Sequence, residues 1–182
     1  MSIQNPAPKI LIIGAGLAGL ALAQGLKRAQ PAIPFRIFER DSSATFRAQG
    51  YRIRITPKGA AALSRLLPTP LFTAFEKTSG RLAQEGHRLL ALDGTEADWP
   101  AGPRPPPGPG KAYNADRAVL RNILLSGVEE EVSFGRRFES YKVKDDGTIE
   151  VHFAGGSTEV GSLLIGADGA TLPRAPTAPP RL

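Results

Sequence analysis

The hydrophobic pattern of the chain begins with a strand signal followed by a helix signal. Residues 10–13 form a continuous apolar run that is rich in β-branched side chains. Such a run predicts a strand covered on both faces, as in the middle of a parallel sheet. Leucine and alanine dominate residues 17–29, which predicts a helix that Pro31 and Pro34 bring to an end. A short apolar run at residues 35–38 predicts the next strand and completes the start of a βαβ fold.

Residues 51–67 continue with a second strand-and-helix pattern. Arg52 and Arg54 alternate with apolar or aromatic neighbours, so this strand is expected to have one solvated or ligand-facing side. Pro57 then stands where the first turn of a helix accepts proline, and that helix is expected to run to Leu67. Further along, residues 81–92 suggest one or two extended segments.

Residues 99–110 interrupt the pattern. They hold six prolines in twelve residues, and proline fits neither a sheet ladder nor the interior of a helix. We therefore expect a loop or a polyproline II spacer, with a ligand for a proline-recognition domain as the alternative.

Regular patterning returns in the last third of the chain. A helix is predicted within residues 114–132, with Glu129–Glu131 as its solvated end. The apolar positions at helical spacing are Ala118, Leu120, Ile123, Leu124 and Val128. Short strand signals follow, separated by the hairpin signals Asp146-Gly147 and Gly155-Gly156. We expect three antiparallel strands and an apolar strand at residues 163–165, a meander that returns to a central strand.

Three glycines lie between the first strand and the first helix, in the spacing Gly14-x-Gly16-x-x-Gly19. Gly14 permits a tight turn, Gly16 lets pyrophosphate oxygens approach the main chain, and Gly19 lets helix and strand pack closely. The N–H groups of this bend, that of Leu17 included, and the positive end of the helix dipole would bind the anion. The pattern thus predicts a dinucleotide site.

Glu39 supports this interpretation by its position. It follows Gly19 by twenty residues, where a carboxylate accepts hydrogen bonds from an adenosine ribose and disfavours a 2′-phosphate. NADPH is therefore not expected in the glycine bend. The alternative is a close strand–helix joint without a ligand, in which Glu39 is a surface charge.

Composition narrows the class of protein. The chain has 182 residues, of which 41% are hydrophobic and 22% charged, which suits one ordinary domain with a genuine core. Neither an 18-residue apolar run nor a signal peptide is visible, so the expected location is cytoplasmic, with no transmembrane segment. Cysteine is absent, and His87 and His152 lie far apart, so we expect neither a thiolate nucleophile nor a metal site.

The net charge of +6 raises the question of nucleic acid. The basic residues are scattered singly among apolar ones, and no aromatic platform accompanies them. A solvated face and an anion-binding cleft explain the charge as well, so no nucleic-acid partner is expected.

The order of elements discriminates between NAD and FAD. An NAD domain would continue with alternating strands and helices, whereas this chain passes from Glu39 through a helix and a proline-rich spacer to a meander. With the glycine motif near the N-terminus, this order resembles the FAD-dependent aromatic-hydroxylase-like monooxygenases, flavoproteins of the p-hydroxybenzoate hydroxylase type.

Two arginine-bearing segments carry the resemblance further. "FERDSSATFRAQGYRIRI" is similar to a family segment whose arginine reaches FAD, which implies this role for Arg47 and, as a weaker match, for Arg40. "ADRAVLRNIL" is similar to the family's R-x-x-L helix, which implies that Arg117 lies near the flavin or its phosphates.

The end of the sequence resembles the family and then departs from it. "LLIGADGATLPRA" begins like the motif G-A-D-G-x-x-S-x-x-R, whose aspartate helps to hold FAD; Gly166, Asp168 and Gly169 match. Leu172 and Ala175 stand where the family has serine and arginine. A later G-D motif and the rest of the substrate-binding domain are missing, so the chain is expected to be C-terminally truncated.

The fold class expected from the resemblance is α/β. It is a Rossmann-like FAD/NAD(P)-binding βαβ fold with a β-meander and part of a substrate-binding subdomain. The expected division is a βαβ ADP-binding unit at 9–48, a partial substrate-domain insertion with the proline-rich loop at 49–112, a helix with the meander and last strand at 113–169, and an atypical tail at 170–182.

The resemblance also implies the activity. NAD(P)H, as co-substrate, would reduce FAD, and O₂ would supply the oxygen that hydroxylates or epoxidises a small organic substrate of aromatic, polyketide-like or terpenoid-like type. A truncated chain is expected to bind FAD weakly and turn over little. The alternatives are a non-catalytic dinucleotide-binding module and a fragment of an NAD-dependent dehydrogenase.

Overall fold

The computed structural model describes residues 9–45, 51–81, 90–95 and 110–169. Their centre is a parallel sheet of four strands in the order β10-β1-β2-β6. These strands are β1 (Ile10–Ile13), β2 (Phe35–Phe38), β6 (Val132–Ser133) and β10 (Leu163–Gly166). The two strands predicted at the start of the chain are confirmed. The apolar strand after the meander does return to β1, and it forms the edge of the described sheet.

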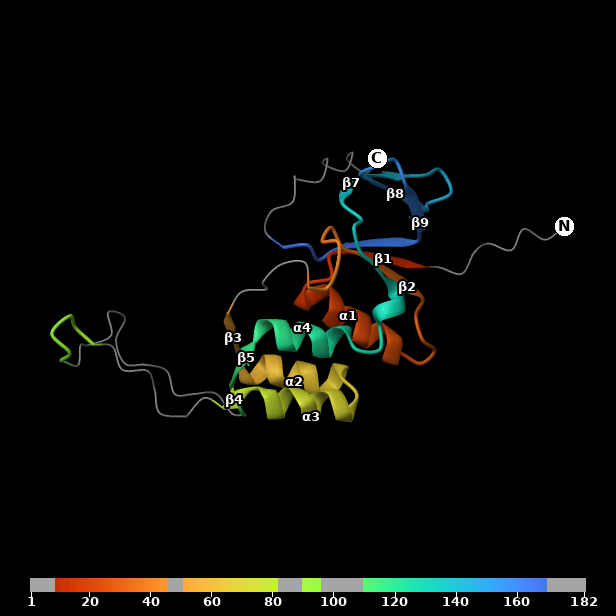
Figure 1. Ribbon diagram of the computed structural model, residues 1–182. Coiled ribbons are helices and arrows are strands. Elements are labelled where there is room, and N and C mark those ends of the chain that lie inside the picture. Colours follow the sequence, from red (N-terminus) through yellow and green to blue (C-terminus); the bar gives the residue numbers. More distant parts are fainter. Residues whose placement is uncertain (1–8, 46–50, 82–89, 96–109, 170–182) are drawn as a thin grey trace, which may run out of the picture.

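Helices cover one face of this sheet. Figure 1 shows α1 and α4 directly beneath it and α2 and α3 further away. Their bounds are α1 (Leu17–Arg28), α2 (Pro57–Leu66), α3 (Thr69–Thr78) and α4 (Arg117–Leu125). The core between the sheet and these helices includes Ile12, Leu20 and Phe75, each fully buried. None of these helices has the length and apolar character needed to cross a bilayer.

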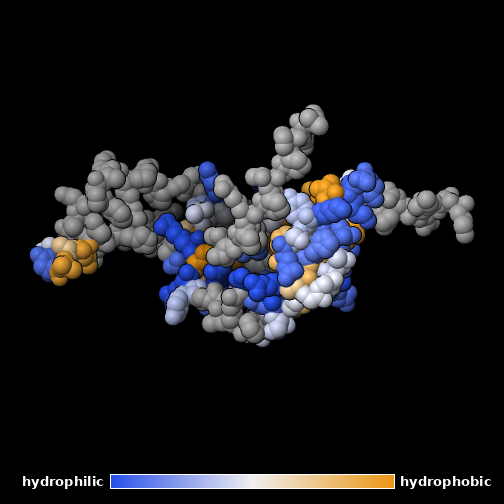
Figure 2. Space-filling view, turned by 90° about the horizontal axis from the view of Figure 1, so that it is seen from above, coloured by the Kyte–Doolittle hydropathy of each residue, from blue (hydrophilic) through white to orange (hydrophobic). Residues whose placement is uncertain are grey.

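The predicted meander covers the other face of the sheet (Figure 1). It consists of β7 (Phe138–Val143), β8 (Ile149–Phe153) and β9 (Thr158–Gly161), paired antiparallel in that order. Side chains alternate along β1, so Leu11 and Ile13 face the meander and pack with Val151 and Phe153. Figure 2, which looks down on this side, shows a mostly hydrophilic surface with small hydrophobic spots.

A separate antiparallel sheet has the order β3-β5-β4. Its strands are β3 (Arg52–Ile55), β4 (Gly80–Arg81) and β5 (Tyr113–Asp116). The expected alternation holds: Ile53 and Ile55 pack on the helical core, whereas Arg52 and Arg54 are exposed. Burial and the hydrogen bond that its hydroxyl donates to Glu76 (2.6 Å) raise the pKa of Tyr113 in β5.

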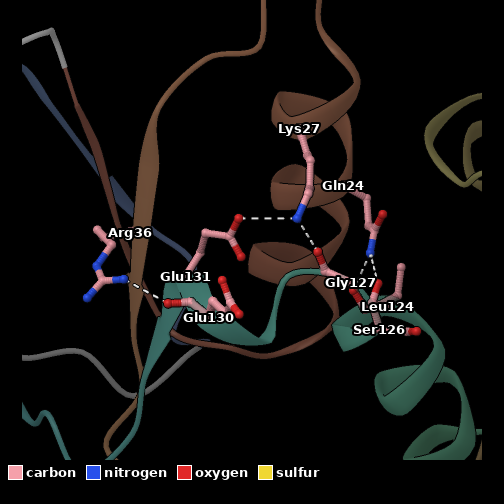
Figure 3. A network of polar contacts seen from close by, with 8 residues as sticks. All are labelled: Gln24, Lys27, Arg36, Leu124, Ser126, Gly127, Glu130 and Glu131. Atoms are coloured by element: carbon pink, nitrogen blue, oxygen red, sulfur yellow. Dashed lines mark hydrogen bonds and ion pairs between the residues drawn. The ribbon is translucent and has the colours of Figure 1, made fainter.

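Polar contacts join the last turns of α1 and α4. Buried Gln24 donates hydrogen bonds to the carbonyl oxygens of Leu124 (2.8 Å) and Ser126 (2.9 Å), which lie at the end of α4 (Figure 3). Lys27 donates to the carbonyl of Gly127 and pairs with Glu131 at 3.2 Å. These contacts satisfy carbonyl groups that the end of a helix leaves without partners.

Two features differ from the sequence-based expectation. The placement of Glu129–Glu131 at the end of a helix is wrong: α4 ends at Leu125, and the three glutamates form a separate 3₁₀ turn, η1 (Glu129–Glu131). Gly127, which lies between α4 and η1, has φ +81°, and a continuing α-helix does not permit this value. In addition, α3 was not predicted. The expectations for residues 82–89, 99–109 and 170–182 lie outside the described residues.

Candidate functional site

The glycine bend connects β1 to α1 at the carboxyl end of the parallel sheet. Gly14 has φ +105°, a left-handed conformation that favours glycine. A Cβ atom built on Gly14 would lie only 2.7 Å from the Cα of Asp168. Gly14 is therefore required both by the turn and by the close approach of the segment that follows β10.

Gly19 is required by a different contact. A Cβ atom at this position would lie 2.1 Å from the carbonyl oxygen of Gly14, well inside any permitted distance. The absence of a side chain lets the first turn of α1 pack directly on the bend. The predicted close packing of helix and strand is present.

Gly16 has no such contact. A Cβ atom there would meet only the carbonyl oxygen of Ala167, at 3.9 Å, which is ordinary van der Waals distance. Its φ of −79° is available to any residue. No feature of the described residues therefore requires glycine here, and the open space in front of Gly16 fits a ligand that approaches the main chain.

The N-terminus of α1 is open to an anion. Gly16 is its N-cap, no side chain caps the helix, and its first turn holds no acidic residue. The first N–H groups of a helix lack intrahelical partners and carry the positive end of the helix dipole. This 12-residue helix therefore presents donors and positive potential at Gly16.

Glu39 lies directly beside the bend, at the end of β2. Its carboxylate accepts hydrogen bonds from the backbone N–H of Ala15 (2.8 Å) and from that of Asp41 (3.0 Å). The residue is only 8% exposed, so it is not a surface charge. A carboxylate has about four acceptor positions, so the oxygens of Glu39 can still accept hydrogen bonds from a sugar.

Arg121 is the residue of this region that the sequence analysis missed. It lies on α4, is 2% exposed, and donates from Nε to the carbonyl oxygen of Ala15 (2.9 Å) and from Nη1 to that of Ala44 (2.5 Å). The available signal was an arginine on the apolar face of a helix, beside Leu120 and Leu124. The R-x-x-L pattern directed attention to Arg117 instead.

The segment after β10 meets the bend from the other side. Ala167 donates a hydrogen bond from its N–H to the carbonyl oxygen of Ile13 (2.7 Å), which carries Asp168 past Gly14. Gly169 follows with φ +92°. The structure therefore brings together the glycine bend, Glu39 and the half-buried Asp168, which are far apart in the sequence.

The other predicted arginines are not tied to the bend. Arg117 is exposed at the start of α4, and its guanidinium forms neither a hydrogen bond nor an ion pair within the described part of the chain. Arg40 is exposed beside Glu39. Arg47 lies outside the described residues.

The chain is similar to fungal flavoenzymes over most of its length. It is 37% identical over 165 residues to the dual O-methyltransferase/FAD-dependent monooxygenase elcB of Phaeosphaeria nodorum, with 88% of this chain and 18% of that protein covered. It is 31% identical over 173 residues to the FAD-dependent monooxygenase dbaB of Emericella nidulans, with 93% and 42% covered. The chain is a relative of the FAD-dependent monooxygenases.

Solved structures agree with this relationship. A crystal structure described as that of an FAD-containing monooxygenase from Photorhabdus luminescens superposes with a TM-score of 0.76 at 30% identity, covering 90% of this chain and 40% of that one. HpxO of Klebsiella pneumoniae, solved with FAD and uric acid, shares the fold with a TM-score of 0.64, at 24% identity and with 92% and 40% covered. No family model matches.

These relatives are much longer than the region they share with this chain. The chain spans 18% to 42% of the two fungal proteins and about two fifths of the two solved structures. The expected α/β class, with its parallel sheet and meander, is confirmed.

Proposed function

We propose that this chain binds FAD, with the pyrophosphate at the N-terminus of α1 and the adenosine ribose at Glu39. The observation that carries the proposal is the open space at Gly16, where the described residues provide no reason for a missing side chain. The uncapped N-terminus of α1 begins at Gly16, and the buried carboxylate of Glu39 accepts a hydrogen bond from the N–H of the neighbouring Ala15. The bend therefore fits a phosphate group.

The choice of FAD over NAD rests on the relatives and on the fold. The related proteins named above are FAD-dependent monooxygenases, and a meander covers the sheet where an NAD domain continues its strand–helix alternation. An NAD-dependent dehydrogenase and a non-catalytic dinucleotide module are the outcomes that would replace this proposal.

We assign further roles to the remaining predicted residues as part of the same proposal. Asp168 would face the cofactor from the end of β10, and Gly169 would leave room beside it. Arg117 would contact FAD with its guanidinium, which makes no polar contact within the described part of the chain. Arg40 and Arg47 would contact FAD from the segment after β2.

The activity we propose is that of a monooxygenase portion acting on a small organic molecule of aromatic, polyketide-like or terpenoid-like type. FAD supplies the redox chemistry with NAD(P)H and O₂ as co-substrates, while the chain binds and orients the cofactor. In the proposed division, residues 49–112 belong to the substrate part. Strands β3 and β4 belong to this part and pair with β5, which belongs to the segment that follows. One sheet therefore contains strands of both parts.

The decisive experiment replaces Gly16 by a larger residue. Gly16→Val is expected to weaken FAD and ADP binding at least about tenfold, because a branched side chain occupies the space needed by the phosphate. Dissociation constants come from quenching of flavin fluorescence and from calorimetry with ADP. The midpoint of thermal unfolding without ligand should stay close to that of the wild type.

Gly80→Val provides the matched control. Gly80 lies in β4, and a Cβ atom there would also meet only one carbonyl oxygen, at 3.8 Å, but far from the bend. This variant should bind FAD and ADP like the wild type. Unchanged binding by Gly16→Val, or thermal stabilisation of the wild type by NAD and not by FAD, would reject the proposal.

A further inference from the structure

We propose that Arg121 is a positioning residue of the dinucleotide site: it sets the direction of the Gly16 N–H and supplies buried positive charge behind the glycine bend. This inference rests on the function proposed above. No motif in the sequence assigned a role to this residue.

The first step of the argument is the place of the guanidinium. Arg121 joins two segments that are far from it in the sequence, because its two hydrogen bonds end on Ala15 in the bend and on Ala44 after β2. The fork of donors on an arginine suits such a bridge better than the single ammonium of a lysine. Arg121 therefore holds the two loops at a fixed separation.

The second step concerns the peptide between Ala15 and Gly16. Glu39 accepts from the N–H of Ala15, and Arg121 donates to the carbonyl of the same residue, so Ala15 is held on both sides. The C=O of Ala15 and the N–H of Gly16 belong to one planar trans peptide and point in opposite directions. By holding this carbonyl, Arg121 directs the Gly16 N–H away from α4 and toward the open space.

The third step concerns charge. Arg121 is 2% exposed, and both of its acceptors are neutral carbonyls. The ion pairs of the described residues involve Lys9, Lys27, Lys111 and His152, not Arg121. The carboxylate of Glu39 lies on the other side of Ala15 and forms no ion pair with the guanidinium within the described part of the chain. A buried cation is costly unless it is paired, and the pyrophosphate of a bound dinucleotide would add negative charge across the bend.

The test separates phosphate recognition from general stability. Arg121→Gln is expected to weaken ADP binding at least about tenfold while changing adenosine binding less than about threefold. Arg121→Lys, which keeps the charge but cannot bridge both carbonyls, should recover part of the ADP affinity. In the ligand-free protein, both variants should show faster amide hydrogen exchange in residues 14–19 and 40–45.

Gln24→Leu is the matched control. Gln24 is also buried and also donates to two carbonyl groups, but its contacts join the last turns of α1 and α4, away from the glycine bend. This variant should lose stability without changing the ratio of ADP to adenosine affinity.

The outcomes are distinct. Equal losses of ADP and adenosine affinity in the arginine variants, or unchanged exchange in residues 14–19, would overturn the inference. If Arg121→Gln does not fold, Arg121→Lys decides by the same two measurements. A wild-type protein that binds neither FAD nor ADP would reject the proposed function, while the exchange data still decide whether Arg121 positions the bend.

Discussion

Gly19 and Gly16 lie three residues apart, yet the structure predicts a large loss of stability from alanine at one position and almost none at the other. Gly19→Ala is expected to lower the free energy of unfolding by about 1–3 kcal/mol, because its methyl group would collide with the carbonyl of Gly14. Gly16→Ala should stay within about 0.5 kcal/mol of the wild type. Urea denaturation of both variants checks this. Equal stabilities would mean that the helix does not pack on the bend as described.

Glu39 and Arg121 hold Ala15 from two sides, but the sequence pattern led to only one of them. Glu39 was predicted because its distance from the glycine motif along the chain is set by the length of one helix and one strand. Arg121 depends on how α4 docks against the bend, which no local spacing encodes. The R-x-x-L pattern therefore pointed to the exposed Arg117.

At the scale of elements, the N-termini of the helices differ in how they are capped. Asp116 caps α4 by accepting hydrogen bonds from the N–H groups of Ala118 (2.9 Å) and Val119 (3.0 Å), and Thr56 caps α2. The start of α3 has no side-chain cap, but Pro70 removes one of its N–H donors. The start of α1 is uncapped as well, and it lies beside the open space at Gly16.

The cap of α4 yields a prediction of its own. Asp116→Ala is expected to lower the free energy of unfolding by about 1 kcal/mol, because two helix N–H groups lose their acceptor. Asp116→Asn, whose side-chain oxygen can still accept, should recover most of this loss. Chemical denaturation followed by circular dichroism measures both. An alanine variant as stable as the wild type would contradict the role of the cap.

The unpredicted helix α3 shows where sequence patterns mislead. Pro68 is its N-cap and Pro70 lies in its first turn, where proline is favoured. The apolar residues Leu71, Phe72 and Phe75 then follow at helical spacing, and Phe75 is fully buried against Tyr113. The helix is stabilised mainly by this packing, which tertiary structure supplies.

At the scale of the whole molecule, the parallel sheet separates two cores. The smaller core joins the meander to the sheet through Phe153, whose ring centroid lies 4.7 Å from that of Phe38. The guanidinium of Arg136 lies 4.7 Å from the Phe153 ring as well. The meander is therefore attached by a few large side chains.

The core between the meander and the parallel sheet leads to the last prediction. Phe153→Ala is expected to lower the free energy of unfolding by about 3–5 kcal/mol, because it leaves a cavity between meander and sheet. Val143→Ala, at an exposed position of β7, should change it by less than about 0.5 kcal/mol. Thermal and urea unfolding measure both. Similar effects of the two substitutions would show that the meander is not held by this core.

The sequence by itself determined the elements whose signals are local. Strands 10–13 and 35–38, the helix after the glycine bend and the hairpins at Gly147 and Gly155 follow from side-chain periodicity and from backbone conformations that favour glycine. The spacing of the glycines likewise determined the shape of the bend, since Gly14 adopts a positive φ there and Gly19 avoids the carbonyl oxygen of Gly14.

Only the tertiary structure decided which distant residues surround that bend. The burial of Glu39, the passage of Asp168 beside Gly14 and the bridge made by Arg121 depend on how β10 and α4 pack against β1 and α1. Such contacts arise from the shapes of whole elements, and the periodicity of one segment holds no information about the partner it meets.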